Sequence, residues 1–327
     1  MKISDWILSG LLIAGFLLSL FSGSQQLGMM DFAYQLFLGN EIINEIFWKL
    51  RLPRTVACLF CGAILAFAGV CTQGLFRNPM AEPSLLGVNS CALVFMLMGQ
   101  WLQFQLFSFF NLRILAAFGG AFLCLFLLRI FIKNRNADTL MLILFGICFN
   151  AFLGAVITIS YLLLPAEVLK NMFFWSVGDC SMVQWTHVWP LLLTLPILLI
   201  VGLRWSKSLD VFSLGSEEAK LLGIKIEKMQ HIFLILIAVG VSVSLNAVGN
   251  IGFLALLSPH ILRFWKGPNH RTLMIYTPIV GAIWMMTADF FSKISIWGTS
   301  LPIGVFIIAT GLPLFLWGVL RRNYGIA

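Results

Sequence analysis

Residues 51–90 read RLPRTVACLFCGAILAFAGVCTQGLFRNPMAEPSLLGVNS. An apolar run rich in small residues stops at RNPMAEP, and a second apolar run follows. Pro79 and Pro83 cannot continue a helix, and they bias the residues before them to extended backbone. Asn78 and Glu82 offer polar groups to the backbone that the turn frees. The stretch therefore predicts two membrane helices, over about 55–75 and about 84–103, joined by a cytoplasmic turn.

The composition places this hairpin in a lipid bilayer. Of the 327 residues, 60% are hydrophobic and 10% are charged, whereas a soluble domain has about 25% charged residues. A single water-soluble core could not hide this much apolar surface, which predicts an all-α polytopic membrane protein. The apolar N-terminal run lacks an A-x-A-like cleavage site and is longer than a typical signal sequence core, so we expect an uncleaved first span.

The apolar runs also predict the number and direction of the spans. Runs near the roughly 20 residues that cross a bilayer predict about ten spans. They lie at about 6–23, 55–75, 84–103, 112–132, 140–163, 186–203, 230–249, 250–265, 272–292 and 303–320, the eighth being short and interrupted. The stretch 30–48 reads as an extracytoplasmic connector with an amphipathic helix. Most of the 21 lysines and arginines fall on one side, which predicts that both termini are cytoplasmic.

The number and position of the charged residues exclude several classes of function. The net charge of +8 reflects basic cytoplasmic loops, and without a soluble basic domain we expect no nucleic-acid partner. Ionisable residues within the spans are scarce, Asp289 and Lys293 excepted, which argues against an ion-coupled carrier. The chain has no Walker A pattern, so any ATP would be hydrolysed by another subunit.

The longest cytoplasmic loop, about 204–229, contains a short predicted helix. In SEEAKLLG, Ser216 can cap the helix, Glu217 and Glu218 suit its first turn, and Gly223 can end it. The segment is either a solvated surface helix or a rigid knob that fits a groove on a soluble partner.

On the outer side, KLRLPR gathers Lys49, Arg51 and Arg54 where the positive-inside rule disfavours cations. The cluster is either a docking site for an acidic partner or a set of side chains that snorkel to the interface. Cys58 and Cys61 lie in an apolar helix without a second pair, and we interpret them as packing residues.

Several blocks of the chain resemble the FecCD-type permeases, the membrane subunits of ABC importers for ferric siderophores, haem and cobalamin. RLPR, the small-residue helix, QGLFRNPMAEPSLLG, FWSVGD, GNIGFLALLSPHILRFWKGPNHR and SLPIGVFIIATGLPLFLW match the family's motifs in order and spacing. Met80, Ala255 and Ser300 depart from the usual Leu, Gly and Glu. The resemblance covers nearly all of residues 1–322 and implies that 1–327 form a single transmembrane permease domain.

The resemblance also implies partners and sites. The partners would be a second copy of the chain, two ATPase subunits that use ATP and Mg²⁺, and an extracytoplasmic binding protein, all at a bacterial plasma membrane. The chain itself would bind no cofactor or metal and hold no catalytic residue. The coupling site would be Glu217, Glu218, Ala219, Leu222 and Gly223; the cytoplasmic gate Asn78, Met80, Asp138 and Thr139; and the docking site Arg51, Arg54 and Lys293. The expected cargo is a ferric siderophore, with haem or cobalamin as alternatives.

Overall fold

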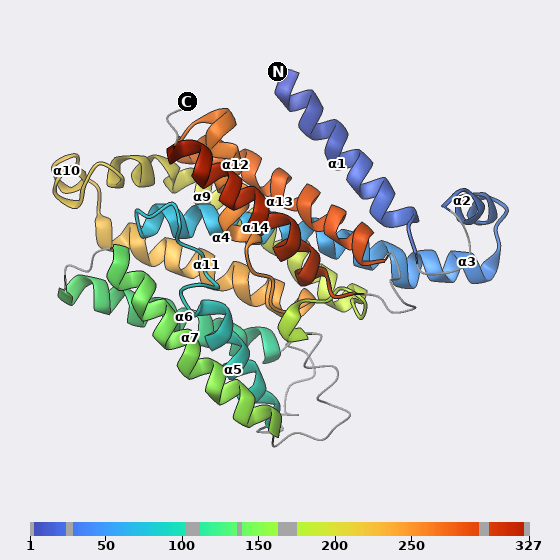
Figure 1. Cartoon of the computed structure of the whole chain (residues 1–327), viewed down its shortest axis with the longest axis horizontal. Helices are drawn as coiled ribbons and strands as arrows, with labels where there is room; N and C mark the ends of the chain where they lie inside the picture. The colour runs from blue at the N-terminus through green and yellow to red at the C-terminus, as the bar shows by residue number, and fades with distance from the viewer. Residues whose placement is uncertain are drawn as a thin grey trace.

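The computed structural model describes residues 3–23, 29–101, 112–135, 139–162, 175–293 and 301–323, and this part of the chain is helical without a strand. Figure 1 shows the arrangement. The helices are α1 (Ile3–Phe21), α2 (Met29–Phe37), α3 (Glu41–Ile46), the π-helical turn η1 (Phe47–Arg51), α4 (Leu52–Leu75), α5 (Val88–Trp101), α6 (Leu112–Arg135), α7 (Thr139–Leu162), α9 (Trp185–Phe212), α10 (Ser216–Leu221), α11 (Ile226–Val248), α12 (Leu254–Lys266), α13 (His270–Ser292) and α14 (Ile303–Asn323).

Helix α4 is the centre of the bundle and packs against α13, α11, α9 and α12. Its small residues allow this, as the sequence predicts. A Cβ atom on Gly62 would lie 2.4 Å from the carbonyl oxygen of Gly281, and one on Gly69 would lie 1.9 Å from that of Ala255. Only glycine permits backbones to approach this closely, so these contacts fix α4 against α13 and α12.

Helix α12 is too short to cross a membrane alone. It has 13 residues, about 20 Å of helix against a hydrocarbon core of about 30 Å. The predicted span at 250–265 is therefore a half-length helix. The backbone break before it includes Gly249 and Phe253, with φ of 74° and 68°.

Five helices among the described residues are long and apolar enough to cross a membrane: Glu41–Leu75, Leu144–Leu162, Trp185–Phe212, Ile226–Val248 and His270–Ser292. Shorter apolar helices lie at Asp5–Phe21, Val88–Met98, Ile114–Ile130 and Ile303–Leu316. The count of about ten spans stays a prediction.

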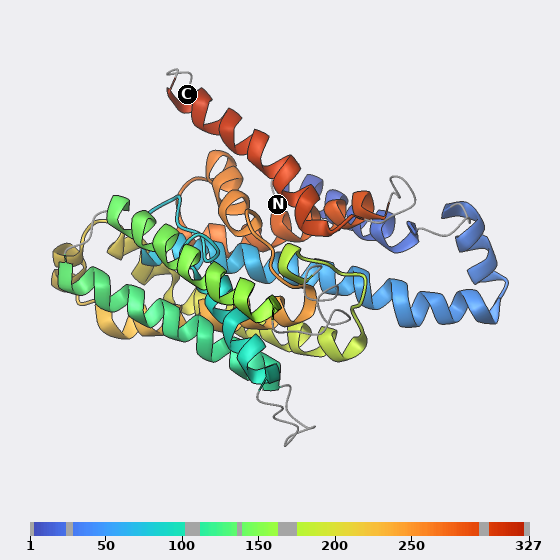
Figure 2. The same ribbon diagram turned by 60° about the horizontal axis from the view of Figure 1, so that its bottom comes forward.

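The bundle has two distinct ends. Helix α10 projects at one end, and α2 and α3 lie at the opposite end (Figures 1 and 2). Helices α2 and α3 confirm that the stretch 30–48 is helical. Helix α7 packs chiefly on α5, and most of the apolar surface of its Leu144–Leu162 segment is exposed.

Candidate functional site

The short helix α10 is a projecting knob with a rigid base. The helix follows Gly215 as its N-cap, so the predicted side-chain cap by Ser216 is not formed. Ala219 is fully buried, and its carbonyl accepts a hydrogen bond from Ile224 N–H at 2.9 Å. This contact holds the knob to its own loop.

The outer surface of α10 combines acidic and apolar side chains. Glu217 and Glu218 are exposed in the first turn, and Leu221 and Leu222 are exposed after the last one. Gly223 follows the helix with φ of 80° and donates its N–H to Lys220 at 2.9 Å, which confirms it as the residue that ends the helix. The coupling role of this surface stays a prediction.

The turn at 76–87 is more buried than a plain hairpin. Asn78 is 4% exposed, and its side-chain oxygen accepts from Met80 N–H at 2.9 Å. Met80 is 37% exposed and reaches outward. Glu82 is almost fully buried, and burial raises the pKa of this carboxyl group to about 7. The turn is therefore a packed element that presents Met80.

The other half of the predicted gate is only partly visible. Asp138 lies outside the described residues. Thr139 is the first residue of α7. The proximity of this pair to Asn78 and Met80 stays a prediction.

A clasp that the sequence analysis missed joins α7 to the turn. The amide nitrogen of Asn150 donates to the carbonyls of Ser84 and Leu85, both at 3.0 Å, and its oxygen accepts from Ser90 Oγ at 2.7 Å. One turn earlier on α7, a Cβ atom on Gly146 would lie 2.4 Å from the Leu85 carbonyl oxygen. We call these contacts the Asn150 clasp. Asn150 is an amide side chain in an otherwise apolar predicted span, and this could have marked it in the sequence.

A second polar link joins the start of α5 to the break before α12. Asn89, in the first turn of α5, donates to the side-chain oxygen of Asn250 at 2.8 Å. Asn250 lies in this break. Gln73, near the end of α4, donates to the carbonyl of Leu256 in α12 at 3.2 Å. Side-chain hydrogen bonds therefore connect α4 and α5 to the region of the break.

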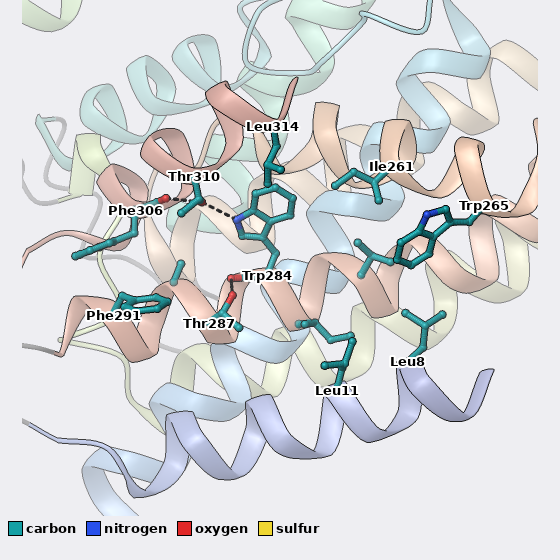
Figure 3. A pocket seen from close by; sticks show the side chains of 13 residues that line it. Leu8, Leu11, Ile261, Trp265, Trp284, Thr287, Phe291, Phe306, Thr310 and Leu314 are labelled. Atoms are coloured by element: carbon teal, nitrogen blue, oxygen red, sulfur yellow. Dashed lines mark hydrogen bonds between the residues drawn. The ribbon is translucent and has the colours of Figure 1, made fainter. Parts of the chain in front are cut away.

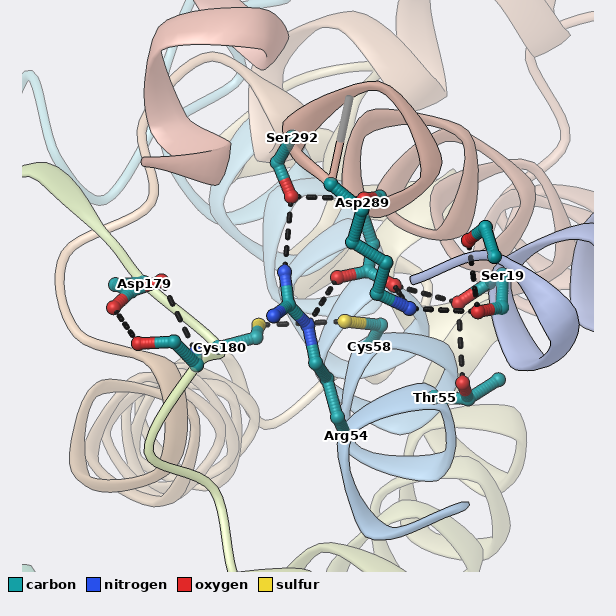
Figure 4. A network of polar contacts seen from close by, with 11 residues as sticks. Ser19, Arg54, Thr55, Cys58, Asp179, Cys180, Asp289 and Ser292 are labelled. Carbon is teal, nitrogen blue, oxygen red and sulfur yellow. Dashed lines mark hydrogen bonds and ion pairs between the residues drawn. The ribbon is translucent and has the colours of Figure 1, made fainter. Parts of the chain in front are cut away.

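At the opposite end of the bundle, two of the predicted docking cations share a buried carboxylate partner. Asp289 is fully buried and pairs with Arg54 at 2.6 Å and with Lys293 at 2.5 Å. Its carboxylate also accepts from Ser19 in α1 at 2.6 Å. The side chains of Arg54 and Lys293 are only 17% and 6% exposed. Figure 4 shows this cluster, which ties α1, α4 and α13 together.

The third predicted docking cation is also engaged within the chain. Arg51 is 7% exposed, donates to the carbonyl of Phe21 at 2.9 Å, and lies 3.5 Å from the ring centroid of Phe32. Lys49 is exposed and pairs with Glu45. Internal pairing takes up these cations because a buried charge needs a partner. Docking by Arg51, Arg54 and Lys293 thus stays a prediction, without free charges to support it.

An apolar groove runs between α1, α12, α13 and α14, with a volume of about 270 Å³ (Figure 3). Its polar contacts are few, chiefly a hydrogen bond from Trp284 Nε1 to Thr310 Oγ1 at 3.1 Å. The groove has no charged lining residue. Nor do the described residues contain three or more His, Cys, Asp or Glu side chains placed to hold a metal. The groove gives no indication of a cargo site.

Long apolar helices, the half-length helix α12 and a projecting knob define a multi-pass helical membrane protein. The model of the FecCD transport family matches residues 11–321, and the chain belongs to this family of ABC importer permeases.

Relatives with assigned names support the same class. The vitamin B12 import system permease protein BtuC of Photorhabdus laumondii is 33% identical over 84% of this chain and 81% of its own. That of Salmonella paratyphi A is 32% identical over 97% and 95%. A metal-chelate type ABC transporter solved in an inward-facing conformation has a TM-score of 0.79 at 28% identity, covering 97% of this chain and 98% of that chain.

Proposed function

We propose that the chain is the membrane-spanning subunit of an ATP-driven importer that moves a large metal chelate from an extracytoplasmic binding protein into the cytoplasm of a bacterium. The whole of 1–327 acts as one permease domain, with ten spans and both termini inside. The observation that carries the proposal is the polarity of the bundle, with the α10 knob at one end and α2 and α3 at the other (Figure 1).

The knob supports a mechanical link to an ATPase. Its exposed carboxylates and leucines form a compact surface, and the buried Ala219 resists rotation of the helix against its loop. Two ATPase subunits would grip one knob each. ATP and Mg²⁺ would be used there, and this chain would contribute no reacting group.

Two apolar helix faces support assembly of two copies. Helices α7 and α14 expose large side chains along their length: Leu144, Ile147, Phe152 and Ile159 on α7, and Val305, Ile308, Leu312 and Leu316 on α14. A second copy covering these faces would enclose a path between the two chains. Walls of this kind hold a bulky cargo loosely, as release to the cytoplasm requires.

Two cargoes are to be tested first. The sequence-based expectation is a ferric siderophore, and the names of the relatives at 32–33% identity favour cobalamin. Cells with and without the chain would be compared for uptake of radiolabelled iron as several siderophores and as haem, with labelled cobalamin alongside. If uptake of one cargo is lost without the chain, and vanadate blocks that uptake when the chain is present, the result supports the importer and identifies its cargo. Uptake that resists vanadate and collapses with an uncoupler would refute the ATP-driven mechanism in favour of an ion-coupled carrier.

A further inference from the structure

Two cysteines that lie far apart in the sequence meet at the α2–α3 end of the bundle. Cys58 is in the second turn of α4, and Cys180 is in the segment that precedes α9. Their Sγ atoms lie 3.3 Å apart, and both side chains are fully buried. Figure 4 shows the pair beside Arg54. The contact is specific, because the fold must bring together residues that are 122 positions apart.

Both cysteines lie in segments that hydrogen bonds hold in place. Cys58 lies in an uninterrupted helix. Next to Cys180, Asp179 N–H donates to the carbonyl of Val248 at 2.9 Å, and Ser181 N–H donates to the Asp179 carboxylate at 3.1 Å. Neither sulfur depends on a flexible segment to reach the other. A disulfide bond of about 2.05 Å would require each sulfur to move by only about 0.6 Å.

The compartment that this end of the bundle faces decides whether a disulfide can form. In the proposed orientation this end of the bundle faces the outside of the cytoplasmic membrane, where disulfides form and persist. The sequence alone favours packing roles for Cys58 and Cys61, because they lie in an apolar helix without a second pair, and it gives no sign that Cys180 lies beside α4.

We propose that Cys58 and Cys180 form a disulfide bond that fastens the 178–184 segment to α4. The two thiols lose two protons and two electrons, which pass to a disulfide-bonded thiol oxidoreductase of the outer compartment and leave it as a dithiol. The bond forms while the chain folds, before both sulfurs become buried. It closes a loop that contains α5, α6 and α7, the helices that carry the Asn150 clasp and the predicted gate.

The proposal rests on the proposed orientation and is tested by counting free thiols. Cells are quenched in acid, and the denatured chain is alkylated with N-ethylmaleimide and weighed by mass spectrometry. The chain has seven cysteines, so the disulfide leaves five adducts before reduction and seven after. Seven adducts before reduction overturn the proposal.

Variants identify the bonded pair. Cys180→Ser is expected to give six adducts with or without reductant, because its partner is left free. The matched control is Cys61→Ser, a buried cysteine one turn along α4, which is expected to give four before reduction and six after. Four adducts before reduction in Cys180→Ser would place the bond elsewhere and refute this pairing.

A separate variant tests the orientation. Leu38 is 67% exposed in the connector between α2 and α3. In intact cells, Leu38→Cys is expected to react with a membrane-impermeant maleimide more than the unsubstituted chain does. If Leu38→Cys is labelled and the unsubstituted chain gives seven adducts, the disulfide is refuted and the proposed importer function stands. Failure to label refutes the orientation, and with it the chemical setting of the bond.

Discussion

Replacing Asn150 by alanine removes three hydrogen bonds, two that attach α7 to the turn between α4 and α5 and one that attaches it to Ser90 in α5. Interhelical hydrogen bonds in membrane proteins contribute about 0.6 kcal/mol each on average, so the clasp is worth about 2 kcal/mol. This corresponds to a factor of roughly 30 in the equilibrium between attached and released turn, since 1.4 kcal/mol is tenfold. The Gly146 contact remains, and the helices should still assemble.

The expected consequence follows from the proposed gate. Releasing the turn from α7 lets the two halves of the gate move independently, so ATP hydrolysis continues while less cargo is transported per ATP. The assay measures ATPase activity and cargo uptake together in proteoliposomes that contain the whole transporter. Ser90→Ala loses one bond of the three and should show about a third of the free-energy effect.

A matched control separates gating from general damage to α7. Thr158 lies on the same helix, and its hydroxyl bonds only to the carbonyl of Gly154 in its own helix, at 2.8 Å. Thr158→Ala should keep the transport ratio of the unsubstituted chain. If Asn150→Ala behaves like Thr158→Ala, or lowers ATPase activity and uptake in equal proportion, the reasoning about the clasp is wrong.

Three further predictions concern the coupling knob, the outer charge cluster and the buried carboxyl of the turn. Glu218→Lys or Gly223→Pro should abolish uptake while the chain still inserts, measured as uptake against membrane-fraction protein; wild-type uptake would exclude the coupling role. Asp289→Asn leaves Arg54 and Lys293 buried without a countercharge and should destabilise the chain by about 3–5 kcal/mol, seen as a lower Tm in detergent; an unchanged Tm would contradict the pairing. Glu82 has a pKa of about 7 against a usual 4.5, so the folded chain holds its proton longer and loses stability as pH rises from about 4.5 through 7. Glu82→Gln should therefore stabilise the chain by roughly 3 kcal/mol at pH 8 and hardly at all at pH 4; an equal gain at both would refute the assignment.

Local sequence signals predicted several of these features. Pro79 and Pro83 marked the turn, because proline excludes helix wherever the chain goes next. Gly223 marked the end of α10, because a positive φ strongly favours glycine. Each of these signals depends on the residue's own backbone, which is why it could be recognised without a structure.

The remaining features depend on partners distant in the sequence. Arg54 and Asp289 are 235 positions apart, so the cations of KLRLPR looked free when they were already paired. The bonds of Asn150 end on main-chain carbonyls 65 and 66 positions away, and every residue has a carbonyl. Composition and periodicity carry no information about such pairs.

The backbone break before α12 links these contacts to movement. Irregular backbone at membrane depth is tolerated where it is buried in protein or lines a water-filled cavity. Asn250 in this break is partly buried, and it accepts the hydrogen bond from Asn89, which is 4% exposed in the first turn of α5. A force applied at the α10 knob reaches α11 directly, since α10 contacts both α9 and α11, and α11 leads straight into the break before α12. The Asn150 clasp extends the same connection from α5 to α7, whose apolar face is exposed. We therefore expect the break before α12 to be the element through which a pull at the α10 knob shifts α5 and α7.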